Sequence, residues 1–212
     1  MIRVSRTLMF ASAVGAAAVL AAPSANAVPV VWQFGVGTGG DIGLTATQLS
    51  VPNSIPIIVS AFGGGDLFRK ELGGDESGIG LTNDPSGEDE ISAGHGFVQL
   101  DLAALNAIPP TSTALSFMAD STTGADEWSV CLTNTADSNA CVTPITGTDE
   151  LIHTINTGGA RFLDVSAVTG NILLAEVNSN VPAAAPEPAS LALLGTALVG
   201  LGILRRRRRP AA

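Results

Sequence analysis

Carboxylate side chains are concentrated between Asp66 and Glu90, where eight Asp and Glu residues are interleaved with glycines. Calcium takes about six to eight oxygen ligands from carboxylates and carbonyls, and glycines allow a loop to fold closely around the ion. This segment is therefore a candidate calcium site, and calcium is the one cofactor that the sequence suggests. The candidate ligands are six of its acids: Asp75, Glu76, Asp84, Glu88, Asp89 and Glu90.

The spacing of these acids matches no familiar calcium-binding loop. In Asn83–Glu90, Asp89 stands at the position where an EF-hand loop requires glycine. Gly73–Glu76 also departs from the nonapeptide pattern of calcium-binding β-rolls. The alternative is a solvated acidic loop that keeps the protein soluble and prevents self-association. Both interpretations stay open on the sequence alone.

Signatures of catalysis are scarce. The two histidines, His95 and His153, fall on different expected elements, the first in a surface turn and the second on the solvent face of a strand. The nucleophile and zinc motifs Gly-x-Ser-x-Gly, Ser-x-x-Lys and His-Glu-x-x-His are absent. Glycoside hydrolysis needs two acids facing each other across a cleft, which a sequence does not show. We therefore predict no catalytic residue and a protein that is not an enzyme.

The two cysteines, Cys131 and Cys141, flank a turn-rich stretch. We expect a hairpin in which Glu127–Thr133 pairs with Ala140–Ile145, so that Cys131 faces Cys141 and Val130 faces Val142. Closely opposed residues of antiparallel strands suit disulfide geometry. The alternative is two free thiols. An oxidising compartment would favour the disulfide.

The charges divide the chain into a middle and two ends. Between Val28 and Ala185 there are 18 acids and 3 bases, a net charge of −15, which argues against nucleic acid as a partner. At the N-terminus, Arg3 and Arg6 precede an apolar run and then Ala25-Asn26-Ala27. These are the three regions of a secretory signal peptide, residues 1–27, cleaved after Ala27 and exported by the Sec machinery. The alternative, a membrane anchor, would be short.

The C-terminus carries a second candidate targeting signal. A linker at residues 182–188 ends in Pro186-Glu187-Pro188, and the apolar run Ala189–Leu204 follows. As a helix this run spans roughly 24 Å, slightly short for a bilayer core of about 30 Å. A basic tail, residues 205–212, opens with Arg205, Arg206, Arg207, Arg208 and Arg209, which would hold this end in the cytoplasm. The run therefore predicts a transmembrane helix.

This arrangement of Pro-Glu-Pro, apolar helix and arginines resembles the PEP-CTERM sorting signal, with an ordinary C-terminal anchor as the alternative. The resemblance implies that an exosortase cleaves near Pro186-Glu187-Pro188. The protein would then be anchored transiently in the inner membrane before it reaches the cell surface or the extracellular space. It also implies an envelope or biofilm-matrix protein of a Gram-negative bacterium. The resemblance does not extend to the middle of the chain.

The middle, residues 28–181, shows short apolar or alternating runs separated by turn residues. This pattern predicts an all-β fold, an antiparallel β-sandwich, with one helical turn at Leu102–Ala107. Gly78–Leu81 and Phe97–Leu102 faintly resemble the lectin-type, jelly-roll-like domains of other PEP-CTERM proteins. The alternating register of Trp128 with Val130 and Leu132 places this ring in the core rather than on a sugar platform.

From these features we expect a non-enzymatic structural protein of the cell surface or biofilm matrix. The first alternative is a calcium-dependent carbohydrate-binding module with extracellular polysaccharide as its partner. The second is a secreted glycan hydrolase.

Overall fold

The computed structural model describes residues 27–71, 76–108, 114–121, 125–138, 141 and 143–182. All of these residues belong to one compact unit, residues 26–184, which has its own hydrophobic core. A segment with its own core can fold independently. The expected signal peptide, transmembrane helix and basic tail lie outside the described residues, except for Ala27.

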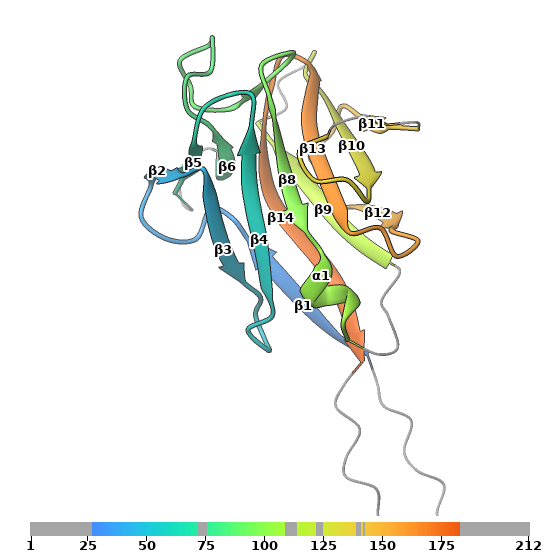
Figure 1. The fold of residues 1–212 in the computed structure, drawn as a ribbon. Helices are drawn as coiled ribbons and strands as arrows, with labels where there is room; N and C mark the ends of the chain where they lie inside the picture. The colour runs from blue at the N-terminus through green and yellow to red at the C-terminus, as the bar shows by residue number, and fades with distance from the viewer. Residues whose placement is uncertain are drawn as a thin grey trace, which may run out of the picture. The chain divides into compact units, whose positions relative to one another are not determined.

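The unit consists of two antiparallel sheets and one helical turn, so the expected all-β sandwich is confirmed (Figure 1). The eight-stranded sheet has the order β12-β9-β14-β6-β5-β2, with β1 and β7 also paired to β14. Its strands are β1 (Ala27–Gln33), β2 (Gly40–Gly43), β5 (Leu67–Lys70), β6 (Gly78–Leu81), β7 (Ile91–Ser92), β9 (Ala114–Asp120), β12 (His153–Asn156) and β14 (Asn171–Pro182).

The six-stranded sheet has the order β11-β10-β13-β8-β4-β3. Its strands are β3 (Thr45–Leu49), β4 (Pro56–Phe62), β8 (Phe97–Asp101), β10 (Glu127–Thr133), β11 (Ile145–Gly147) and β13 (Phe162–Thr169). The helical turn α1 (Ala103–Asn106) confirms the expectation for Leu102–Ala107. Among the residues described, no helix is long and apolar enough to cross a membrane.

The core lies between the two sheets because alternate residues of each strand point inward. In β4, for example, Ile57, Val59 and Ala61 are buried while Pro56 and Ile58 are exposed. Trp128 is fully buried, as its alternation predicts, and packs edge-to-face against the Phe117 ring with centroids 4.8 Å apart. Burying such rings removes a large apolar area from water and gives a favoured aromatic geometry.

Strand β14 holds the eight-stranded sheet together. It pairs with β1 and β9 along its length and with β6 near its start (Figure 1). The two-residue strand β7 also pairs with its first residues. In the β1 ladder, Ala27 is the partner of Pro182. The chain therefore enters and leaves this unit at the same end of one sheet.

The cysteines form the expected disulfide, with their Cα atoms 5.4 Å apart. The register expected around them is wrong, because Val130 faces Ile145 of β11 and not Val142. The loop before β11 instead makes hydrogen bonds to the sheet. The Asp137 amide donates to Gln99 Oε1 over 3.3 Å, and Asn134 Oδ1 accepts from the Arg161 amide over 2.9 Å.

The loop closed by the disulfide lies beside a buried carboxyl that sequence reasoning did not single out. Asp164 of β13 is flanked by Cys131 of β10 and Gln99 of β8. Its side chain is only 2% exposed, and Gln99 Nε2 donates to Asp164 Oδ1 over 2.8 Å. Burial raises the pKa of Asp164 to about 6, and the Gln99 hydrogen bond opposes this effect only in part.

Replacing this carboxyl should stabilise the protein at neutral pH. Because the pKa is raised in the folded state, the wild-type free energy of unfolding should fall as the pH rises from about 4 to about 6. Asp164→Asn keeps an acceptor for Gln99 but cannot ionise. We expect it to gain up to about 3 kcal/mol at pH 7 and to lose this pH dependence.

Urea unfolding of residues 26–184 between pH 3.5 and 7.5 checks this prediction. Asp41→Asn, at an exposed carboxylate of β2, is the matched control and should keep the wild-type pH profile. An Asp164→Asn variant that remained as pH-dependent as wild type would contradict the assignment.

Candidate functional site

The last part of the carboxylate-rich segment, residues 82–90, forms the loop between β6 and β7, and Asp84 organises this loop. This side chain is buried and accepts hydrogen bonds from the hydroxyls of Ser86 and Ser92 and from the backbone amides of Ser86 and Glu90. Burial alone would raise the pKa of Asp84, but these hydrogen bonds outweigh it and hold the pKa below its ordinary value. Both carboxylate oxygens of Asp84 are therefore used to stabilise the loop.

The end of this loop packs directly on β6 at Gly80. A Cβ at Gly80 would lie 2.1 Å from the Asp89 carbonyl oxygen and 2.7 Å from Glu90 Cα. Only glycine permits so close an approach between the two backbones. This contact positions Glu90 immediately before β7, with its side chain only 4% exposed.

The buried Glu90 carboxylate is paired with Lys70, the last residue of β5. Lys70 Nζ lies 2.5 Å from Glu90 Oε1, 2.9 Å from Glu76 Oε2 and 4.0 Å from Glu88 Oε2. The Ser121 hydroxyl, just after β9, adds a hydrogen bond of 3.0 Å to Glu90. One ammonium group therefore faces three carboxylates, which leaves the cluster with a net negative charge.

Burial and ion pairing shift these groups in different directions. Desolvation by burial raises the pKa of Glu90, although Lys70 and Ser121 oppose it. The hydrogen bond from Lys70 lowers the pKa of Glu76. For Lys70, burial favours the neutral amine, but its bonds to Glu90 and Glu76 outweigh burial and raise its pKa. Lys70 is therefore held in its charged form.

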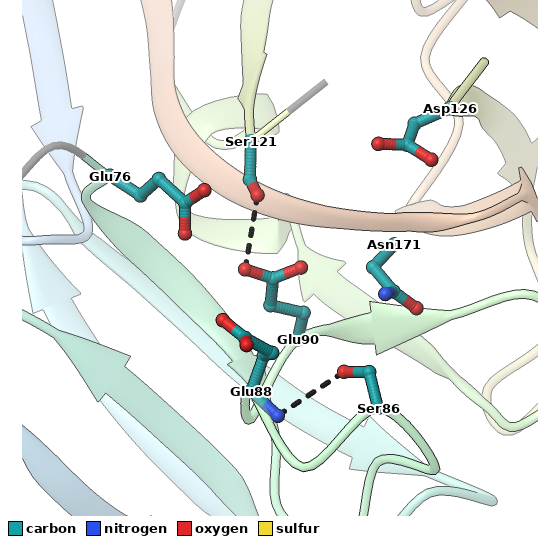
Figure 2. A pocket seen from close by; sticks show the side chains of 7 residues that line it. All are labelled: Glu76, Ser86, Glu88, Glu90, Ser121, Asp126 and Asn171. Carbon is teal, nitrogen blue, oxygen red and sulfur yellow. Dashed lines mark hydrogen bonds between the residues drawn. The ribbon is translucent and has the colours of Figure 1, made fainter. Parts of the chain in front are cut away.

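Next to this cluster lies an open, polar pocket of about 280 Å³, which we call the carboxylate pocket. Figure 2 shows Glu76, Glu88 and Glu90 gathered on one side and Asp126 with Asn171 on the other. Asn171 is the first residue of β14. The lining residues are Glu76, Ser86, Glu88, Glu90, Ser121, Asp126 and Asn171.

The structure brings together three of the six acids expected as calcium ligands. One carboxylate oxygen from each of Glu76, Glu88 and Glu90 lies within 4.8 Å of the others. Asp84 and Asp89 do not join this group, Asp84 because its oxygens accept the hydrogen bonds of the loop. Asp75 lies outside the described residues.

Sequence reasoning missed the pocket residues that come from distant elements, namely Ser121, Asp126 and Asn171, together with the neighbouring Lys70. Lys70 carried a signal, because it is one of only three basic residues between Val28 and Ala185. A lone lysine in so acidic a stretch is a natural partner for a buried acid. Ser121 and Asn171 carried no such signal.

The histidines lie outside the carboxylate pocket. His95 is exposed in a turn before β8. His153 is partly exposed on β12, where its Nε2 lies 2.5 Å from Asp149 Oδ1 and its ring contacts Trp128 with centroids 4.6 Å apart. The hydrogen bond with His153 lowers the pKa of Asp149. Neither histidine is adjacent to the acids of the pocket.

Every Trp and Phe ring among the described residues is buried or half-buried. Trp32 and Trp128 are fully buried, and Phe62 and Phe68 are the most accessible phenylalanines. A sugar-stacking site normally presents an exposed Trp or Tyr ring. The described part of the chain presents no such platform.

Comparison with known proteins identifies the C-terminal segment. Residues 184–209 match the family model of the PEP-CTERM protein-sorting motif. The match contains Pro186, Glu187 and Pro188 and the arginines from Arg205 to Arg209, all of which lie outside the described residues. No curated protein matches the chain. The chain is therefore a PEP-CTERM sorting domain-containing protein, and this motif implies export and exosortase processing.

Proposed function

We propose that this protein is a non-enzymatic structural component of the cell surface or of a biofilm matrix. The PEP-CTERM tail implies export and processing, and the unit that it carries is an acidic β-sandwich. In this proposal a signal peptide ends at Ala27, residues 189–204 form a transient membrane helix, and the sandwich belongs to the jelly-roll-like type.

The observation that carries the non-enzymatic proposal is the position of Lys70. Its ammonium group bonds to both Glu76 and Glu90, the two acids whose pKa values shift in opposite directions. Such a pair would otherwise suit acid–base chemistry, including glycan hydrolysis. Because Lys70 holds both carboxylates, the cluster is better suited to fastening the β6–β7 loop to β5 than to reacting with a substrate.

A second candidate is a calcium-dependent carbohydrate-binding module. The gathered oxygens of Glu76, Glu88 and Glu90, with Ser121 and Asn171 beside them, favour it. Oxygen ligands of this kind suit calcium, and the net negative charge of the cluster favours a cation over an anion. For calcium to bind, it would have to compete with Lys70 for Glu76 and Glu90.

The effect of calcium on thermal unfolding should separate the two candidates, and removing Lys70 tests whether its ion pairs hold the loop. Lys70→Gln leaves the buried Glu90 without its cation, so we expect a loss of about 3 kcal/mol in the free energy of unfolding at pH 7. Thermal unfolding of residues 26–184 in calcium and in chelator measures the effect. If the cluster is structural, calcium leaves the wild-type Tm unchanged. Arg161→Gln, which removes an exposed ion pair with Asp101, is the control and should change the stability much less than Lys70→Gln.

A calcium-induced rise in the wild-type Tm that Glu88→Gln abolishes would contradict the structural interpretation and favour the calcium module. A Lys70→Gln variant as stable as wild type would show that the ion pair does not hold the loop.

Binding to polysaccharide tests the function itself. We expect residues 26–184 to remain in the supernatant when the extracellular polysaccharide of the producing organism is sedimented, in calcium and in chelator alike. The expectation follows from the buried aromatic rings and the strongly acidic composition. Co-sedimentation that is lost with chelator and with Glu76→Gln would establish the carbohydrate-binding alternative instead.

A further inference from the structure

The turn between β3 and β4 lies at the end of the unit where the chain enters and leaves. Val51, just after β3, forms an antiparallel bridge with Val31 of β1. Strand β1 begins at Ala27, the partner of Pro182. Because the two bridged segments run in opposite directions, the residues that follow Val51 advance toward Ala27. Figure 1 shows the β3–β4 turn and the start of β1 at the same end of the unit.

The helical turn α1 lies at this end as well. It follows β8, whose last residue, Asp101, is paired with Ile58 near the start of β4. We call this end of the unit the terminal end. Its described segments are residues 27–31, 49–55, 102–108 and 178–182.

Ser50 organises the β3–β4 turn so that most of its polar backbone groups are bonded within the protein. The Ser50 hydroxyl donates to Pro52 O and accepts from the Ile55 amide, each over 3.0 Å. The Ser50 carbonyl accepts from the Ser54 amide over 3.1 Å, and the amide and carbonyl of Val51 are both bonded to β1. A turn whose backbone groups are already bonded loses little when it leaves water for a less polar layer.

This turn presents apolar side chains to solvent. Val51 is 73% exposed, which makes it the most exposed large apolar side chain among the described residues. Leu49 is 51% exposed, and Pro52 is exposed next to Val51. The polar residues of the turn, Asn53 and Ser54, carry no charge.

The terminal end has no charged residue, although the stretch from Val28 to Ala185 has a net charge of −15. Asp101 and Arg161, which border it, pair with each other over 3.0 Å. The carboxylate pocket lies at the other end of β14, which spans roughly 36 Å at about 3.3 Å per residue. An anionic surface is therefore repelled by the pocket end of the unit and not by the terminal end.

The sorting tail is joined to the unit at the terminal end. Residues 183–188 separate Pro182 from the apolar run that begins at Ala189. Even fully extended, this linker reaches only about 25 Å. Because β14 is longer than the linker, the unit cannot stand on its pocket end while the apolar run is in a membrane. The membrane surface then meets either the terminal end or a side of the unit, and the distribution of charge favours the terminal end.

We propose that the terminal end is a membrane-contact surface, which rests on the lipid headgroups while the sorting tail is still attached. Leu49, Val51 and Pro52 enter the headgroup layer, and the carboxylate pocket points away from the membrane. The contact depends on the membrane helix of the proposed function, which holds the linker at the bilayer. A few aliphatic side chains bind lipid weakly by themselves, but the short linker keeps the lipid surface at a high effective concentration. Removal of the tail therefore also releases the contact.

Site-specific fluorescence of residues 28–212 in vesicles of phosphatidylethanolamine and phosphatidylglycerol tests the proposal. Because both native cysteines form the disulfide, one introduced cysteine can be labelled selectively with the fluorophore NBD. We expect nitroxide-labelled lipid to quench the label at Val51→Cys at least about threefold more strongly than the label at His95→Cys. His95 is the matched control, because it is exposed in the turn before β8, whereas β8 ends at the terminal end.

A second substitution tests whether the apolar side chains make the contact. In the Val51→Cys protein, Leu49→Asp places a charge in the headgroup layer and should lower the quenching to the level of the His95 label. Ile145→Asp, at an exposed apolar residue of β11, should leave the quenching unchanged. Circular dichroism checks that each variant is folded.

Flotation of the same vesicles separates failure of the contact from failure of the membrane helix. If the chain floats with the vesicles but the two labels are quenched equally, the contact is overturned and the helix stands. A folded Leu49→Asp variant that is quenched as strongly as its parent would also overturn the contact. If the chain does not float, both the helix and the contact are overturned.

Discussion

The pairing of β14 with its neighbours is the constraint on which the rest of the structure depends. This strand joins β1, β6, β7 and β9 into one sheet, and Leu173, Leu174 and Val177 along it are fully buried. Its first residue, Asn171, lines the carboxylate pocket, and its last, Pro182, is paired with Ala27. One strand thus links the pocket to the end of the unit where the chain enters and leaves.

The carboxylate pocket shows how an acidic protein accommodates a buried acid. Glu90 is held against β6 at Gly80, and the ammonium group of Lys70 supplies the charge that burial would otherwise leave unpaired. The same cation draws Glu76 and Glu88 toward Glu90. The arrangement has two consequences, a loop fastened to the sheet and a net negative pocket open to solvent.

Local patterns in the sequence predicted the fold well. Alternation placed Trp128 in the core, and residues 127–133 form the strand expected there. The pairing expected opposite Val130 was wrong because the loop bonds to Gln99 of β8 and to Arg161, just before β13, which no local pattern reveals. The composition of Asp66–Glu90 indicated an acidic site. It did not reveal the roles of Asp84 and Lys70, because these depend on burial and on pairing between distant elements.

We propose that a folded β-sandwich is delivered outside the cell and separated from its sorting tail. Intact-mass and N-terminal analysis of the protein recovered outside the producing cells tests it most directly. We expect a chain that begins at Val28, retains all of β14 and ends close to Pro186-Glu187-Pro188, without the apolar run and the arginines. Recovery of the protein outside the cells with residues 189–212 still attached would contradict it.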